Sequence, residues 1–260
     1  METFVGQQAT VVPRLGSLLG REHARIGRNN QDACAAGAGL GWHVVAVTDG
    51  CSGGASSEVG ARLGAAFLAA QAPLLLATHS DTAVAARAIT DALAALLVAL
   101  VAGCARPSAR STFVADHLLF SFLVAAVGPA RAVIFGIGDG VILADGDACC
   151  LDPGPDNAPA YLGYRLVPPE ALEPPMSPGA LEPQVHLDRP RAGLSVVGVS
   201  TDGLGEVLAR DRAAAMALLD GPHDRSNPSL LGKRLRALGA RGLAPADDTT
   251  LALLHCQGAP

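Results

Sequence analysis

Dense apolar runs that stop at turn residues dominate the chain and predict a series of short strands. The run Trp42–Thr48 is rich in β-branched residues and ends at Asp49-Gly50, which predicts a buried strand followed by a turn. Four further runs follow one another closely, and their short connections favour antiparallel pairing. These runs are Leu118–Val127, Ala132–Ile137, Val141–Ala144 and Ala148–Leu151. Two more strands are expected at Leu194–Ser200 and Thr249–His255.

Apolar residues at helical spacing predict four helices, two before the closely spaced strands and two near the C-terminus. The second helix is expected to begin at Thr82 as N-cap and to end at Gly103. Its run Ala92–Ala102 has eleven apolar residues, too few to cross a bilayer, so a buried core helix is expected. Because the first two helices are adjacent and rich in alanine, we expect them to pack antiparallel. The predicted helices are Ser56–Ala70, Thr82–Ala102, Arg210–Leu219 and Ser229–Leu238.

A pair of sheets covered by helices on its outer faces fits this order of elements. At 260 residues the chain can form one large domain of the α+β or α/β class, or two small ones. The segment Asp152–Pro190 differs from the rest, because it holds ten of the 18 prolines. It is not expected to form a regular central strand or a long helix. We interpret it as a loop, an insertion or a flap that borders the functional site, and expect its deletion to alter substrate preference more than folding.

Composition excludes several classes of protein. Half of the residues are apolar but only 3% are aromatic, so the core is expected to consist of alanine, valine and leucine. The net charge of −5, without any run of lysine or arginine, argues against nucleic-acid binding. The six cysteines show no zinc-site spacing, and the chain does not open with a secretory signal. Reduced thiols in the cytoplasm are therefore expected.

Aspartates recur in short polar motifs, most of them at the end or start of a predicted strand. Carboxylates at strand ends can meet at one edge of a sheet, and such a cluster is stable only if it binds cations or shifts its pKa values. Hard oxygen ligands suit Mg²⁺ or Mn²⁺, which predicts a metal-dependent hydrolase of phosphate esters. By contrast, Asp145-Gly146 and Asp220-Gly221 are interpreted as plain turns. The motifs are Asn30-Gln31-Asp32, Val47-Thr48-Asp49-Gly50, Ile137-Gly138-Asp139-Gly140, Ser200-Thr201-Asp202-Gly203 and Asp247-Asp248-Thr249-Thr250.

In this order the motifs resemble those of the metal-dependent serine/threonine phosphatases of the protein phosphatase 2C type, in a bacterial-like branch. The first extends back through Gly20-x-x-His23-x-x-x-Gly27, and together the motifs span 20–254. The resemblance implies a single domain over residues 1–260 of the α+β class, in which two antiparallel β-sheets form a central sandwich flanked by antiparallel helix pairs. It also implies hydrolysis of phosphoserine and phosphothreonine in proteins, within bacterial kinase/phosphatase signalling.

The resemblance further implies two Mn²⁺ or Mg²⁺ ions that hold a bridging hydroxide as nucleophile, without a covalent phosphoenzyme. Asp49 would bridge the ions, and the carbonyl of Gly50 would bind one of them. Asp202 and Asp247 would complete the other shell, and Asp32 would act through metal-bound water. A third ion would take Asp139 and Glu206, which lies four residues after Asp202.

Three positions depart from the family pattern. Gln31 stands where a glutamate is usual, Gly27 where a phosphate-binding arginine is usual, and Cys51 where many members have histidine. Arg28 or His23 could then bind phosphate in place of the missing arginine, and a purely structural role for His23 is an equal alternative. These departures leave a second hypothesis open, a phosphatase-like regulatory or binding module with weak or no catalysis. A third is a hydrolase of a small phosphorylated metabolite.

The leading hypothesis also names partners. The substrate would be a phosphoprotein, and the opposing enzyme a cognate serine/threonine kinase. We expect a cytoplasmic monomer that binds neither nucleic acid nor a membrane.

Overall fold

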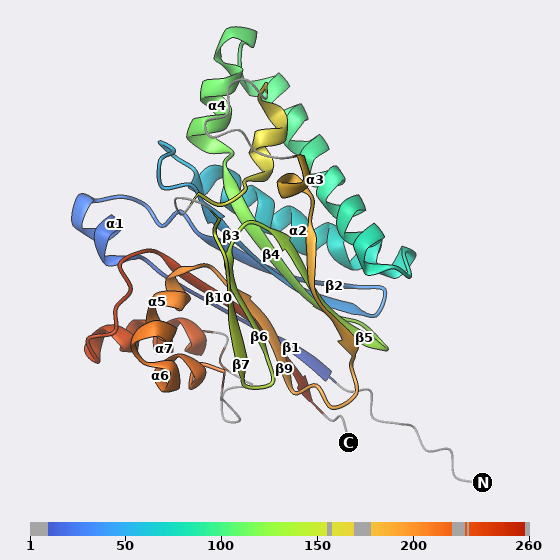
Figure 1. The fold of residues 1–260 in the computed structure, drawn as a ribbon, viewed down its shortest axis with the longest axis vertical. Coiled ribbons are helices and arrows are strands. Elements are labelled where there is room, and N and C mark those ends of the chain that lie inside the picture. The colour runs from blue at the N-terminus through green and yellow to red at the C-terminus, as the bar shows by residue number, and fades with distance from the viewer. Residues whose placement is uncertain (1–9, 155–157, 169–177, 220–226, 228, 258–260) are drawn as a thin grey trace.

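Two five-stranded antiparallel sheets stack face to face, and helices cover both outer faces (Figure 1). The computed structural model describes residues 10–154, 158–168, 178–219, 227 and 229–257. Within these residues the expected α+β sandwich is confirmed. The predicted turn at Asp220-Gly221 lies outside them.

The first sheet has the strand order β1-β10-β9-β6-β7, and the second has the order β2-β3-β4-β5-β8. The first consists of β1 (Thr10–Leu18), β10 (Thr249–Gln257), β9 (Val196–Ser200), β6 (Gly140–Ala144) and β7 (Asp147–Leu151). The second consists of β2 (Ala33–Gly39), β3 (Trp42–Gly50), β4 (Phe120–Val127), β5 (Arg131–Ile137) and β8 (Gln184–Pro190).

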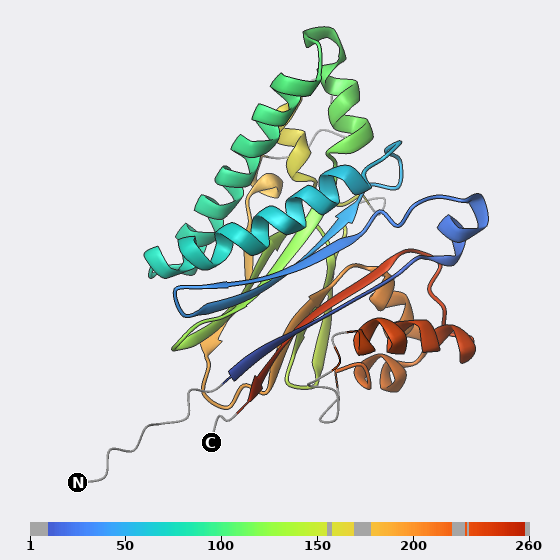
Figure 2. The ribbon, with the colours of Figure 1, turned by 180° about the vertical axis from the view of Figure 1, so that it is seen from behind.

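Helices α2 (Glu58–Thr78) and α3 (Thr82–Cys104) lie over the second sheet, and α4 (Arg110–His117) contacts these two helices beyond the end of the sheet (Figures 1 and 2). The helices on the side of the first sheet are α5 (Gly203–Arg210), α6 (Arg212–Met216) and α7 (Leu230–Ala240). A further short helix, α1 (Arg21–Ile26), follows β1. Helices α2 and α3 run in opposite directions and contact each other, and they diverge away from their connecting turn.

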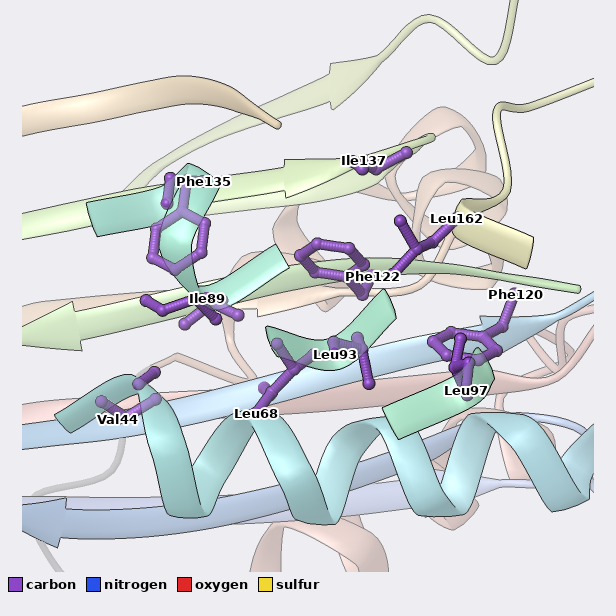
Figure 3. Close-up of a cluster of buried hydrophobic side chains, with 14 of the residues drawn as sticks. Val44, Leu68, Ile89, Leu93, Leu97, Phe120, Phe122, Phe135, Ile137 and Leu162 are labelled. Atoms are coloured by element: carbon purple, nitrogen blue, oxygen red, sulfur yellow. The ribbon is translucent and has the colours of Figure 1, made fainter. Parts of the chain in front are cut away.

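The core has three parts, one between the sheets and one under each helical layer. Between the sheets, valines such as Val45 and Val199 from the facing strands are fully buried. Under α2 and α3 the core contains most of the buried aromatic side chains, including Phe122 and Phe135 (Figure 3). Ile89 of α3 lies against these rings and is fully buried.

By length and apolar composition alone, α2 and α3 could each cross a membrane. The eleven-residue apolar run therefore lies within a helix, α3, that as a whole is long and apolar enough to meet this criterion. Three α3 side chains at helical spacing, Ile89, Leu93 and Leu97, are fully buried against the second sheet. The core-helix expectation holds for this face, and length alone is weak evidence for a membrane.

Two predicted helix boundaries are wrong, and in each case an aspartate side chain explains the difference. Asp81 caps α3 in place of Thr82, because its carboxylate accepts the Val84 amide at 3.0 Å. The predicted helix Arg210–Leu219 breaks at Asp211, whose carboxylate accepts the Ala214 amide at 2.9 Å and starts α6. The Asp145-Gly146 turn is confirmed, and both of its residues have positive φ angles, as tight hairpins require.

The proline-rich segment is more structured than expected. It contributes the 3-10 helix η3 (Leu162–Leu166), and its last part forms β8. Strand β8 lies at the edge of the second sheet, the place where strand prolines are tolerated. Deletion of the whole of Asp152–Pro190 would remove a strand paired along β5, so we expect such a deletion to disturb folding, and the interpretation as a flap stays a prediction for the part before β8.

Candidate active site

The polar motifs meet because antiparallel register places their strand ends together. The end of β3 pairs with the start of β2, as Thr48 lies opposite Ala33. The end of β9 pairs with the start of β10, as Ser200 lies opposite Leu251. One hydrogen bond then joins the two sheets, since the Thr201 hydroxyl donates to Asp32.

Asp32, Asp49 and Asp202 form the centre of this cluster, in which Asp32 is buried and the other two are partly exposed. Burial raises the pKa of Asp49 well above its ordinary value, and the charges of Asp32 and Asp202 raise it further. Burial likewise raises the pKa of Asp32, although the hydrogen bond from Thr201 opposes the shift. Asp202 is hydrogen-bonded to Asp49, and burial with nearby carboxylates raises its pKa to about 7. The strongest charge effects on these three groups thus come from other carboxylates.

Asp139 and Asp247 lie at the rim of the cluster. Asp139 is buried between β5 and β6, and the Ser121 hydroxyl bonds to its carboxyl group. Burial raises the pKa of both Asp139 and Asp247. Each also acts electrostatically on Asp202, so all five aspartates expected from the sequence lie close enough to influence one another.

Asp248 organises the loop that carries Asp247. Its carboxylate accepts the backbone amides of Gly20 and Gln31, each at 2.7 Å. The same carboxylate lies 2.9 Å from Nδ1 of His23, whose ring is buried. This geometry gives Asp248 a structural role. His23 Nδ1 therefore has a structural partner, and it lies 3.9 Å from Asp247.

Two residues expected to bind ligands are engaged elsewhere. Glu206 does lie on the helix after Asp202, but its carboxylate accepts the backbone amides of Ala246 at 2.9 Å and Asp247 at 3.2 Å. It also pairs with Arg210 at 3.2 Å. These contacts make Glu206 a support for the Asp247 loop, and its expected role as a ligand of a third ion stays a prediction.

Arg28 is engaged in a comparable way. Its guanidinium donates to the carbonyl of Ser52 at 2.5 Å and to that of Gly54. It therefore holds the loop after Asp49, and the expected phosphate contact would require these bonds to open. Gly27 ends α1 with a φ of 71°, a left-handed conformation that an arginine would strain.

Gln31 and Gly50 shape the floor of the site. The Gln31 amide nitrogen donates to the Ser57 hydroxyl at 2.6 Å, while its Oε1 is buried without a hydrogen-bond partner. A Cβ on Gly50 would lie 2.7 Å from the Ser57 hydroxyl and 2.8 Å from the Gln31 carbonyl. Only glycine fits there, so the backbone at Gly50 can lie this close to Ser57 and Gln31.

Two tyrosines, which the sequence motifs did not indicate, border the site. Tyr161 and Tyr164 both lie against Cys51, two residues after Asp49. They are the chain's two tyrosines, and both fall in the proline-rich segment. The presence of both tyrosines in one proline-rich segment was the feature of the sequence that could have indicated them.

The donor set fits a hard divalent cation. All five aspartates offer oxygen, the ligand type that Mg²⁺ and Mn²⁺ prefer. Asp202 Oδ1 is buried without a hydrogen-bond partner, which is costly unless a cation or proton satisfies it. Among the described residues, His23, Asp247 and Asp248 also bring ligand atoms within 4.8 Å of one another.

The comparisons with known proteins agree with this site. The profile of the family described as Protein phosphatase 2C matches residues 19–238. The chain therefore belongs to the protein phosphatase 2C family, and by family it is a protein serine/threonine phosphatase. Among curated proteins, none matches the chain.

Solved structures share the fold. The serine/threonine phosphatase Stp1 from Staphylococcus aureus aligns with a TM-score of 0.61 and 14% identity, over 99% of each chain. A bacterial serine phosphatase aligns with a TM-score of 0.61 and 14% identity, over 95% of this chain and 98% of that one. The catalytic domain of PstP, solved in complex with two manganese ions, aligns with a TM-score of 0.53 and 18% identity, over 96% of this chain and 100% of that one.

Proposed function

We propose that this chain hydrolyses phosphoserine and phosphothreonine in proteins and needs Mn²⁺ or Mg²⁺ to do so. The observation that carries the proposal is the cluster of buried and partly buried aspartates whose charges raise one another's pKa. Such a cluster is costly to fold without cations. A cluster that costs stability and lies at one end of the sandwich is best explained by ligand binding.

The divalent ions would be held by Asp49, the carbonyl of Gly50, Asp202 and Asp247. When bound, two such ions supply an activated water and neutralise charge on the phosphoryl oxygens. A third ion would bind Asp139 and Glu206, and Glu206 would first have to release its present backbone contacts.

The other residues orient this set. Thr201 keeps Asp32 directed into the site through its 2.6 Å hydrogen bond. Asp248 holds α1 and the Gln31 backbone beside the Asp247 loop. Arg28 fixes the loop after Asp49, and it would bind a phosphate only after these hydrogen bonds open.

We also propose that the substrate is a phosphoprotein in bacterial signalling, opposed by a cognate serine/threonine kinase, and that the chain acts as a cytoplasmic monomer. Family membership supports the substrate class. The kinase, the location and the oligomeric state follow from the hypothesis and await their own tests.

A regulatory module with weak catalysis is the second candidate. The observation that favours it is the engagement of Arg28 with two loop carbonyls, which leaves phosphate without this guanidinium. Gln31 adds to it, because an amide brings no charge to the ions. The two candidates predict different turnover, so one assay separates them.

The test is hydrolysis of a phosphothreonine peptide with Mn²⁺, and after chelation. We expect Mn²⁺-dependent turnover in the wild type and loss of at least a hundredfold in Asp49→Asn. Asp147→Asn is the matched control, because it makes the same change on exposed β7. Activity that survives full chelation, or persists in Asp49→Asn, would remove the proposed mechanism. Absence of turnover together with metal-independent peptide binding would favour the regulatory candidate.

A further inference from the structure

A groove of about 290 Å³ lies between α6 and α7, in the helical layer of the first sheet (Figure 1). Ala214 and Ala217 line it from the α6 side, and Ala237 and Leu238 line it from α7. Ala217 and Ala237 are exposed, so their short side chains leave this apolar floor open to a partner. The groove is as large as a small ligand pocket, which gives it room for an apolar side chain.

Two arginines, one within α7 and one at its end, flank this floor. Arg234 and Arg241 both line the groove and are seven residues apart, which is two helical turns or roughly 10 Å along the axis. Arg241 is exposed and pairs with Asp211 at 3.5 Å. A surface ion pair contributes little, so a carboxylate of a partner can take the place of Asp211. The groove thus combines an apolar floor with positive charge at two points.

The segment that forms this helical layer is basic. Residues 203–241 contain seven arginine and lysine side chains and four aspartates and glutamates, a net charge of +3 in a chain whose net charge is −5. Arg212, Lys233 and Arg236 are exposed on the two helices that line the groove. An acidic partner is therefore repelled by the net charge of the rest of the chain and attracted to this layer. This charge distribution favours a carboxylate-rich occupant of the groove over a neutral one.

Both walls of the groove connect to the active site. Asp202 immediately precedes α5, which α6 follows, and the chain runs from Arg241 to Asp247 in six residues. The Arg210 guanidinium at the end of α5 donates to the Ala244 carbonyl at 3.3 Å, so the two connections contact each other. Six residues span at most roughly 22 Å, so a protein segment in the groove lies within reach of the aspartates.

We propose that this groove docks an acidic segment of the phosphoprotein substrate, with an apolar side chain on the alanines and carboxylates at Arg234 and Arg241. The identity of the partner as a substrate rests on the proposed function, whereas the docking itself needs neither metal ions nor a phosphate. The enzyme then selects its substrates by a segment several residues away from the phosphorylated residue, in addition to the phosphate.

Docking is measured with metal-free protein and a fluorescein-labelled, unphosphorylated peptide in which leucine lies between glutamates. Fluorescence anisotropy should show binding to the wild type. Ala237→Trp fills the groove and should weaken binding at least tenfold, because it occupies the site of the leucine. Ala213→Trp is the matched control, since it makes the same change at an exposed alanine of α6 outside the groove lining, and it should bind as the wild type does.

Charge is tested separately, in variants that keep the groove open. Arg241→Gln should weaken binding of the peptide about fivefold, whereas Arg212→Gln, which replaces an exposed arginine outside the groove lining, should not. Higher salt should weaken binding to the wild type, because exposed charges are screened. A peptide with glutamines in place of the glutamates should bind about tenfold more weakly.

The consequence for turnover is measured with Mn²⁺ on two phosphothreonine peptides, one short and one joined to the docking segment by a flexible linker. For the wild type, the longer peptide should have a KM about tenfold lower than the short one, with similar kcat. For Ala237→Trp, the two peptides should have equal KM. The comparison of two peptides within each variant removes any change in basal activity.

Equal affinity of Ala237→Trp and Ala213→Trp for the acidic peptide, or equally tight binding of the glutamine peptide, would overturn the inference. If Ala237→Trp does not fold, unchanged affinity in Arg241→Gln without salt dependence would overturn it. Self-association of the wild type that Ala237→Trp abolishes would assign the groove to a second copy, and would overturn it as well. A wild type that binds the acidic peptide but hydrolyses neither phosphopeptide would overturn the proposed function, and with it the identity of the partner as a substrate, but not the docking.

Discussion

The Thr201 hydroxyl donates to Asp32 at 2.6 Å and accepts the Thr250 amide at 2.9 Å. Thr201 follows β9 of one sheet, whereas Asp32 precedes β2 of the other. The Thr201 side chain therefore connects the two halves of the sandwich at the carboxylate cluster, beside the connection made by Asp248 and Gln31. It also limits the charge cost of the cluster, because it opposes the rise in the pKa of Asp32.

Thr201→Val should destabilise the protein by about 1–3 kcal/mol, because it leaves a buried amide and a buried carboxyl without their partner. Urea unfolding of the metal-free protein measures the change. Thr78→Val is the control, since that hydroxyl is exposed and bonds only to its neighbours His79 and Leu75. An equal change in the free energy of unfolding for the two substitutions would show that the hydrogen bonds of Thr201 do not stabilise the protein.

Asp248→Asn should destabilise the protein by about 2–4 kcal/mol, because one amide oxygen cannot replace a carboxylate that serves two backbone amides and His23. The control is Asp81→Asn, because asparagine caps a helix about as well as aspartate does. Thermal unfolding compares the two variants. If Asp248→Asn unfolds at the wild-type temperature, the organising role of Asp248 is wrong.

Gly50→Ala and Gly103→Ala should change stability in opposite directions. At Gly50 a methyl group would collide with Ser57 and the Gln31 carbonyl, so we expect a loss of about 1–3 kcal/mol and of activity. At Gly103, near the end of α3, the added methyl meets nothing within 4 Å. Alanine should stabilise that helix by up to about 1 kcal/mol. Chemical denaturation of both variants is the measurement, and a tolerated Gly50→Ala would contradict the close approach.

The metal-free protein should lose stability as pH rises from about 5.5 to 7. The pKa of Asp202 is raised from 3.8 to about 7, so the folded state binds its proton more tightly than the unfolded state does. The stabilisation by the Asp202 proton is complete below the pKa that Asp202 has in the unfolded chain. It is lost as pH rises through the pKa that Asp202 has in the folded protein. One proton corresponds to about 1.4 kcal/mol per pH unit.

Asp202→Asn should flatten this pH dependence, and saturating Mn²⁺ should oppose it. Free energies of unfolding by urea at several pH values provide the measurement. Metal-free protein that becomes more stable between pH 5.5 and 7 would show that the carboxylates do not repel one another in the fold.

The sequence predicted the strands whose side chains are strongly patterned. Strand β3 is a β-branched run and was located to within two residues. Strand β2, by contrast, contains only alanine, glycine and one cysteine, so its conformation depends on pairing with β3 and on α2. A side chain at Gly37 would collide with the backbone of Ala69, which explains its composition but could not be foreseen.

The site was predictable to the same extent. Strand ends identified Asp49, Asp139, Asp202 and Asp247, because register brings such positions together, whereas Asp32 was identified from its motif alone. The tasks of Glu206 and Arg28 depend on which backbone groups lie nearby, and that information exists only in the folded chain. Asp248 lay within a motif, but its three partners lie more than 200 residues away in sequence.

Titration calorimetry of Mn²⁺ into the wild type and Asp202→Asn tests the central claim most directly. If the aspartates converge to hold two cations, the wild type binds two Mn²⁺ ions per chain. Asp202→Asn should then bind at least one ion tenfold more weakly while its metal-free form unfolds at a higher temperature, because a repelling charge is gone. Asp147→Asn should match the wild type in both respects. Absence of Mn²⁺ binding by the wild type, or equal binding by Asp202→Asn, would contradict the account.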